Sequence, residues 1–109
     1  SASTKDGSTS SNIVMNLGME VKSMSFDAAF WSDFDATQTT KLEIQVLVDD
    51  VWTKLFDVKA AMSGSLSYVN IVVNNINASS IRIYAEGTAP TGTGNNGARV
   101  LFDNMKFFA

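Results

Sequence analysis

The sequence predicts an all-β fold, a two-sheet antiparallel β-sandwich with about seven or eight strands and no significant helix. Three observations lead to this prediction. Short apolar segments recur at roughly eight- to twelve-residue spacing between turn-forming residues. Within several segments the apolar side chains alternate with polar ones, which is typical of a strand with one buried face. One sheet alone would hardly bury so many half-apolar strands, so two facing layers are expected.

Two strands are expected before residue 31. The first covers Asn12 to Leu17 and stops at Gly18, and the second covers Met19 to Phe30. Apolar residues recur at every second position of the second segment: Met24, Phe26, Ala28 and Phe30. Val21 is out of phase with this pattern, which predicts a bulge near Lys22–Ser23.

The clearest prediction is a β-hairpin in the middle of the chain. Lys41 to Asp49 alternates, Asp49–Asp50 forms a tight turn, and Val51 to Val58 returns as the partner strand. One face of the first strand carries the apolar residues Leu42, Ile44, Val46 and Val48. The segment before it, Trp31 to Thr40, is polar and is expected to be a loop.

The C-terminal half predicts three more strands. The first is Leu66 to Val73, after a break at Ser63–Gly64. The second is Ser80 to Glu86, and the last is Ala98 to Phe108. In the second, Ile81, Ile83 and Ala85 share one face, and Arg82, Tyr84 and Glu86 share the other. The last strand changes phase at Asp103–Asn104, which predicts a bulge there. The longest loop, Gly87 to Gly97, is rich in glycine.

A length of 109 residues fits one domain. Residues 1–11 are small and polar, so we interpret them as a linker or a cloning remnant, and residues 12–109 as a single β-sandwich domain. This beginning also indicates a module cut from a longer parent multidomain protein.

The composition argues against several function classes. The chain has no His and no Cys, so it lacks the commonest general base, the commonest transition-metal ligand and any thiol. We therefore expect no enzymatic activity. A net charge of −3 and a pI near 4.6 argue against nucleic acid as a partner, because no basic stripe can replace phosphate counterions. No apolar run reaches the roughly 18 residues of a membrane span.

Four segments together resemble a bacterial family. They are Val21–Phe26 (VKSMSF), Ile44–Leu55 with its Asp-Asp-Val-Trp-Thr turn, Ile81–Ile83, and Arg99–Phe107 (RVLFDNMKF). The pattern resembles jelly-roll accessory domains of secreted bacterial proteins and is similar to carbohydrate-binding modules of the galactose-binding-like type. This resemblance implies a non-catalytic domain that tethers or targets a larger secreted protein to glycan. It also implies an oligo- or polysaccharide as the partner and an extracellular or cell-surface location.

Candidate sugar-binding residues are aromatic side chains near polar ones, since flat rings stack on sugar C–H faces and polar groups bind hydroxyls. Trp31 and Phe34 lie beside Asp33 and Asp35 in the expected polar loop, which suits a site at a loop edge. Tyr84 and Arg82 share one strand face. Replacing Trp31 by Ala is expected to abolish glycan retention. Of the other two candidates, Trp52 is expected to pack in the core or on the sheet, and Tyr68 is expected in the core.

The resemblance also implies one structural calcium ion. The similar modules place a calcium ligand in the last strand, where this chain has Asp103, and Asp27 is expected nearby. Calcium prefers six to eight oxygen ligands, which carboxylates, amides and carbonyls supply. The alternative is that Asp103 accepts hydrogen bonds from backbone amides at a bulge.

A second functional hypothesis needs no small-molecule ligand. The surface is rich in Ser, Thr and Asn, which also fits a structural or adhesive spacer such as a stalk, a pilus-like domain or a virion surface domain. Such a domain is expected to pair with its neighbours through exposed strand edges. Glycan binding and concentration-dependent association distinguish the two hypotheses.

Overall fold

The computed structural model describes residues 10–87 and 100–109, except for the side chains of residues 10, 11 and 34. Most of the linker expected over residues 1–11 lies outside the described residues. The same holds for most of the glycine-rich loop expected over residues 87–97, and for the first two residues of the strand expected from Ala98.

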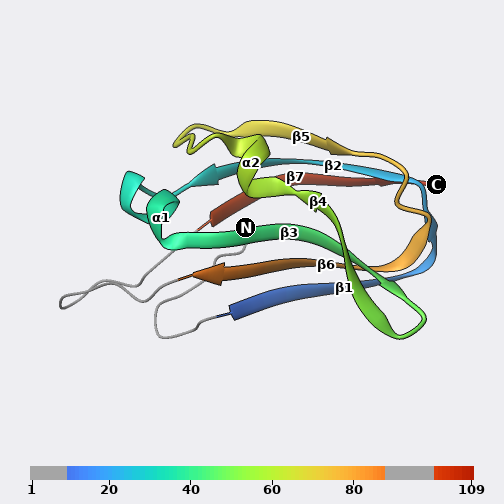
Figure 1. The fold of residues 1–109 in the computed structure, drawn as a ribbon. Coiled ribbons are helices and arrows are strands. Elements are labelled where there is room, and N and C mark those ends of the chain that lie inside the picture. The colour runs from blue at the N-terminus through green and yellow to red at the C-terminus, as the bar shows by residue number, and fades with distance from the viewer. Residues whose placement is uncertain (1–9, 88–99) are drawn as a thin grey trace.

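The described chain forms seven strands in two antiparallel sheets, which confirms the predicted all-β sandwich (Figure 1). One sheet has the order β1-β6-β3-β4 and the other has the order β5-β2-β7. The four-stranded sheet consists of β1 (Ser10–Val21), β6 (Ala78–Gly87), β3 (Thr39–Val48) and β4 (Val51–Asp57). The three-stranded sheet consists of β5 (Val69–Val73), β2 (Ser23–Phe30) and β7 (Val100–Phe108).

The chain alternates between the two sheets. Among the described strands, β3 and β4 are the one consecutive pair in the same sheet, and they form the predicted hairpin. Its turn residues Asp49 and Asp50 both have positive φ angles, 49° and 64°. Two consecutive left-handed residues match the right-handed twist of the paired strands, and Asp tolerates this conformation better than most residues.

The core lies between the two sheets. Apolar residues occupy alternate positions of the strands, so their side chains point into this space. Ile44 and Ile83 from one sheet are buried opposite Phe26 and Phe102 from the other. The rings of Phe26 and Phe102 meet edge to face with centroids 5.8 Å apart, a favoured arrangement of aromatic pairs. The predicted burial of Ile44, Ile83 and Phe102 is therefore confirmed.

The segment expected to be a polar loop contains a short helix, α1 (Asp33–Gln38), which corrects that prediction. Ser32 caps this helix, because its Oγ accepts a hydrogen bond from the backbone N–H of Asp35 at 3.2 Å. At the other end, the Thr39 hydroxyl donates to the carbonyl of Asp35 at 2.9 Å. These local hydrogen bonds explain how a polar segment without an apolar helical stripe forms one helical turn.

A second short helix, α2 (Val58–Met62), follows β4 directly. Asp57 caps it by accepting a hydrogen bond from the N–H of Ala60 at 3.0 Å. Val58 and Met62, four residues apart, are both buried and cover the end of the core. The helix ends at Ser63, which has a left-handed conformation, so the predicted break at Ser63–Gly64 is confirmed.

The first strand differs from its prediction. β1 does not stop at Gly18 but continues to Val21, and the register with β6 shifts between Asn16 and Val21. Gly18 has a φ of 72°, which only glycine adopts at little cost, so it forms an irregularity within the strand. The chain then leaves the sheet at Lys22, where a bulge had been predicted.

Candidate functional site

The outer face of the four-stranded sheet carries a cross-strand array of polar and aromatic side chains. Residues of β3 lie opposite residues of β6 in three consecutive rows, Gln45 with Arg82, Glu43 with Tyr84 and Lys41 with Glu86. From β4, Lys54 lies opposite Gln45, and Trp52 lies opposite Leu47. We call this surface the aromatic face, defined by Lys41, Glu43, Gln45, Trp52, Lys54, Arg82, Tyr84 and Glu86.

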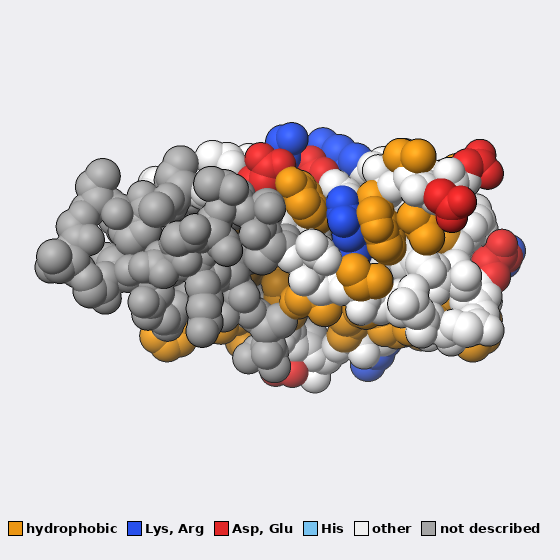
Figure 2. Space-filling model, turned by 90° about the horizontal axis from the view of Figure 1, so that it is seen from below, with side chains coloured by type: hydrophobic (Ala, Val, Ile, Leu, Met, Phe, Trp, Pro, Cys, Tyr) orange, Lys and Arg blue, Asp and Glu red, His pale blue; other side chains and the backbone are white. Residues whose placement is uncertain are grey.

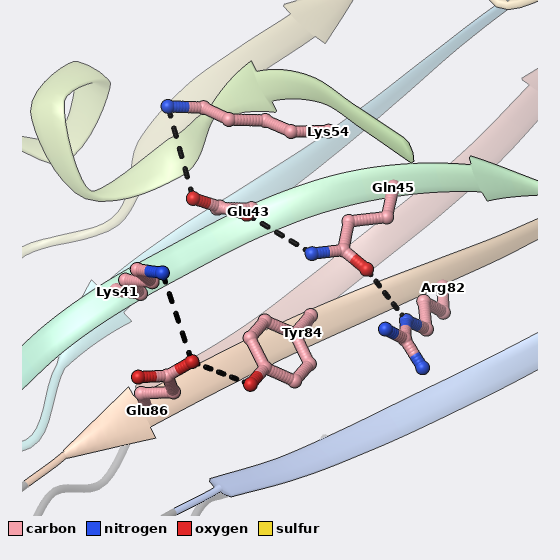
Figure 3. Close-up of polar contacts among 7 residues, drawn as sticks. All are labelled: Lys41, Glu43, Gln45, Lys54, Arg82, Tyr84 and Glu86. Carbon is pink, nitrogen blue, oxygen red and sulfur yellow. Dashed lines mark hydrogen bonds and ion pairs between the residues drawn. The ribbon is translucent and has the colours of Figure 1, made fainter. Parts of the chain in front are cut away.

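One continuous series of polar contacts crosses three strands of the aromatic face (Figure 3). Lys54 Nζ lies 3.7 Å from Glu43 Oε2, and Glu43 Oε1 accepts a hydrogen bond from Gln45 Nε2 at 3.0 Å. The amide oxygen of Gln45 then accepts a hydrogen bond from Arg82 Nε at 2.7 Å. Glu43 and Gln45 are each only 8% exposed, so these contacts compensate for the cost of burying polar groups.

A second series of polar contacts on the aromatic face links Lys41, Glu86 and Tyr84 (Figure 3). Lys41 Nζ lies 3.8 Å from Glu86 Oε2, and the same oxygen accepts a hydrogen bond from the hydroxyl of Tyr84. This hydrogen bond and the negative charge of Glu86 raise the pKa of Tyr84, because both favour the protonated phenol. The phenol is therefore held as a neutral hydrogen-bonding group with a defined orientation.

Arg82 lies between two aromatic rings at the centre of this face. Its guanidinium carbon is 4.7 Å from the ring centroid of Trp52 and 4.9 Å from that of Tyr84. Both distances are typical of cation–π contacts, which orient the guanidinium. Figure 2 looks onto this face and shows hydrophobic, basic and acidic side chains side by side over its centre.

A cleft of about 470 Å³, lined by both apolar and charged residues, adjoins the aromatic face at the end where α1 and α2 lie. Lys41, Glu43 and Lys54 of the aromatic face also line this cleft, so the two surfaces are continuous. From β4 and α2, the cleft receives Asp57 and Lys59. These five charged residues line part of the cleft, which lies beside the aromatic face.

The structure brings together only some of the residues predicted to bind sugar. Arg82 and Tyr84 are in contact on the aromatic face. Trp31, which is 61% exposed, follows β2 of the three-stranded sheet, whereas Tyr84 lies on β6 of the four-stranded sheet. Asp33 and Asp35 belong to α1, where Asp33 is exposed and Asp35 is buried. The Phe34 side chain lies outside the described part of the chain.

Of the core and sheet positions expected for Trp52, the structure has the second. Trp52 is half-buried on the outer side of the sheet and packs against Arg82, so it belongs to the aromatic face. The signal for this was available, because Trp52 lies two residues from the turn and shares the phase of Lys54. Tyr68 was expected in the core, but it precedes β5 and is 50% exposed.

The outer face of the three-stranded sheet carries a smaller group, the amide cluster, defined by Asp27, Asn70, Asp103 and Asn104. Asp27 lies opposite both Asn70 and Asp103. Its Oδ1 accepts a hydrogen bond from Asn70 Nδ2 at 3.0 Å, and its Oδ2 accepts one from Asn104 Nδ2 at 2.8 Å. These two hydrogen bonds, that of Asn104 foremost, hold the pKa of Asp27 below its ordinary range.

The predicted bulge at Asp103–Asn104 is present, with a register shift in β2 opposite it and a φ of 52° at Asn104. Asp103 Oδ1 accepts a hydrogen bond from the backbone N–H of Asn104 at 2.8 Å, as the alternative to calcium binding required. No group of three or more acidic side chains suited to a metal ion occurs in the described residues. Calcium at Asp27 and Asp103 stays a prediction, which calorimetric titration of chelator-treated protein tests.

No helix in residues 10–87 and 100–109 is long and apolar enough to cross a bilayer. Comparison of the chain with protein-family models, with curated proteins and with solved structures found no match. The resemblance to galactose-binding-like modules therefore stays a prediction that depends on the motifs in the sequence.

Proposed function

We propose that this protein is a non-catalytic carbohydrate-binding module that attaches a larger secreted protein to glycan through the aromatic face. The single observation that supports this most is the arrangement of Trp52, Arg82 and Tyr84. Two rings and a guanidinium lie together on one open sheet surface. A sheet is a rigid support, so these groups need little reordering when a ligand binds.

The chemistry of the aromatic face suits a sugar chain. Aromatic rings cover the apolar C–H faces of a pyranose, and polar side chains around them exchange hydrogen bonds with hydroxyls. The more exposed Glu86 supplies an acceptor beside the rings, and Lys41 and Lys54 supply donors. The polar contacts within the face hold these groups in fixed positions before a ligand arrives.

The cleft beside the aromatic face extends the surface available to a ligand. Its 470 Å³ falls in the range of pockets that enclose small ligands, about 300–1,000 Å³. Because the cleft and the aromatic face share Lys41, Glu43 and Lys54, one ligand can contact both. This continuity favours a chain of several sugar units over a single monosaccharide.

The test is retention of the purified protein on immobilised polysaccharides and oligosaccharides of plant, microbial and host origin. The two tyrosines provide a matched pair of variants, because Tyr84 lies on the aromatic face and Tyr68 is exposed elsewhere. We expect Tyr84→Ala to weaken retention at least ~10-fold, which corresponds to about 1.4 kcal/mol. Tyr68→Ala is expected to leave retention unchanged.

The proposal is contradicted if the protein is retained on none of the glycans. It is also contradicted if wild type and Tyr84→Ala are retained equally on every glycan that binds. Thermal unfolding of both variants confirms that each is folded. Light scattering over a range of concentrations tests the alternative function, self-association. A chain that binds no glycan and associates with itself as concentration rises is instead an adhesive or structural domain.

A further inference from the structure

We infer that the ligand of the aromatic face is an acidic glycan, and that Arg82 binds a carboxylate of its uronic acid units. This inference rests on the proposed function, because it names the class of sugar that the same face takes.

The first argument is the unused hydrogen-bonding capacity of Arg82. A guanidinium has five N–H donors, and the one on Nε is occupied by Gln45. Among the described residues, no acceptor contacts the other four, and Figure 3 shows no contact from the terminal nitrogens of Arg82 to the residues drawn. Trp52 and Tyr84 fix the plane of this group. A fixed planar fork matches a carboxylate, which it binds through two parallel hydrogen bonds.

The second argument is that the carboxylates of the face are already paired with other cations. Glu43 lies within ion-pair distance of Lys54, and Glu86 lies within ion-pair distance of Lys41. No ion pair to Arg82 occurs in residues 10–87 and 100–109. Among the described residues, the groups that contact its guanidinium are a neutral amide and two rings, so a ligand carboxylate supplies the anionic partner.

The third argument is the distribution of positive charge. The whole chain carries a net charge of −3. Of its eight Lys and Arg residues, Lys5 and Arg99 lie outside the described part, which leaves six. Four of these six lie on the aromatic face or in the adjoining cleft: Lys41, Lys54, Lys59 and Arg82. The same surface also carries Glu43, Glu86 and Asp57, so four cations less three carboxylates leave one net positive charge there. On a chain whose net charge is −3, this local excess favours an anionic ligand over a neutral one.

The experiment compares polyuronates with their own neutral forms. Polygalacturonate, alginate and hyaluronan are each immobilised beside the carboxyl-reduced polymer, which keeps the sugar backbone but lacks the charge. Dextran sulfate and dextran serve as a second pair that carries charge without a carboxylate. We expect wild type to retain at least one polyuronate ~10-fold more tightly than its reduced form, as charge-assisted hydrogen bonds require.

Three variants test the part played by Arg82. Arg82→Gln removes the charge, and Arg82→Lys keeps the charge but removes the planar fork. Both are expected to lose most of the preference for the acidic polymer. Lys106→Gln is the matched control, because Lys106 is exposed on β7 in the other sheet, and it should retain the preference. Thermal unfolding shows that each variant is folded, and the acid-to-neutral ratio is independent of a modest loss of stability.

Retention of neutral glycans with no preference for any acidic form overturns this inference and leaves the proposed function intact. Equal binding of dextran sulfate and polyuronate, or full preference in Arg82→Lys, also overturns it, because the face then responds to charge alone. Failure to retain any acidic or neutral polymer contradicts the proposed function together with the inference.

Discussion

The two outer faces of the sandwich are built on the same alternation of side chains, yet they differ in how their polar groups are used. In the amide cluster, each carboxylate oxygen of Asp27 accepts a hydrogen bond from a neighbouring amide, so both oxygens have a partner within the fold. On the aromatic face, Arg82 uses one donor and keeps the others available. Polar groups that pair with one another stabilise a sheet, whereas the proposed glycan binding needs a fixed group with unused donors.

The largest expected effect distinguishes the two tryptophans of the chain. Trp52→Ala removes a ring from the aromatic face, and we expect glycan retention to fall at least ~10-fold, equivalent to about 1.4 kcal/mol. Trp31→Ala removes a ring that follows β2 in the other sheet, and retention should not change. Affinity electrophoresis on the retained glycan measures both. The reverse result would place the site at the loop edge predicted from the sequence.

The amide cluster is expected to matter for stability and not for binding. Asn104 has a φ of 52°, a conformation in which a residue with a Cβ atom and no side-chain hydrogen bond is strained. Asn104→Ala and Asn104→Gly both lose the hydrogen bond to Asp27, but only Ala adds backbone strain. We expect the Ala variant to be about 1 kcal/mol less stable than the Gly variant.

Urea unfolding measures this difference between the two Asn104 variants, and both should retain glycan like wild type. Equal stability of the two variants would mean that the left-handed backbone at this bulge relaxes without cost. Reduced glycan retention by either variant would show that the two faces are not separate in function.

Asp27 is expected to make stability depend on pH in the acidic range. Its pKa in the folded chain is lowered, so the unfolded chain binds the proton at higher pH. Its contribution is therefore fully present above the ordinary pKa of an aspartate, about 3.9, and is lost as pH falls through the lowered value. Wild type should melt at a higher temperature than Asp27→Asn at pH 6, and the difference should shrink as pH falls below the ordinary aspartate pKa. A constant difference between the two would contradict this account.

The smallest expected effect is a change in the titration of Tyr84. Glu86 raises the pKa of this phenol by accepting its hydrogen bond, so Glu86→Gln should lower that pKa. Tyr68→Phe leaves Tyr84 as the single tyrosine of the chain and serves as the background. Absorbance at about 295 nm reports phenolate formation as pH rises through the tyrosine range, about 10. An unchanged titration curve would mean that Glu86 does not hold the phenol.

The sequence alone determined the sandwich and the separation of its faces. Ile81 and Ile83 were assigned to the core and Arg82 and Tyr84 to the opposite face, and the structure confirms this. The hairpin at Asp49–Asp50 was equally clear. These features are local, because successive side chains of a strand point to opposite sides whatever the strand pairs with.

The two short helices were missed because their local causes, a few hydrogen bonds and one pair of buried side chains, are weak signals in the sequence. Ser32 and Asp57 each cap a helical turn, but both residues also suit ordinary turns, so their presence in a polar segment does not distinguish the two. The extra length of β1 beyond Gly18 was missed for a related reason, since glycine marks a strand end and a strand irregularity equally well.

Only the tertiary structure decided which side chains meet. Trp52 and Arg82 are thirty residues apart, and they come together because β3 pairs with β4 on one side and with β6 on the other. Asp27 meets Asn70 and Asn104 because β2 lies between β5 and β7. Alternation determines the face on which a side chain lies, but strand order determines its neighbours there. That order results from burying the whole core at once, which no local segment specifies.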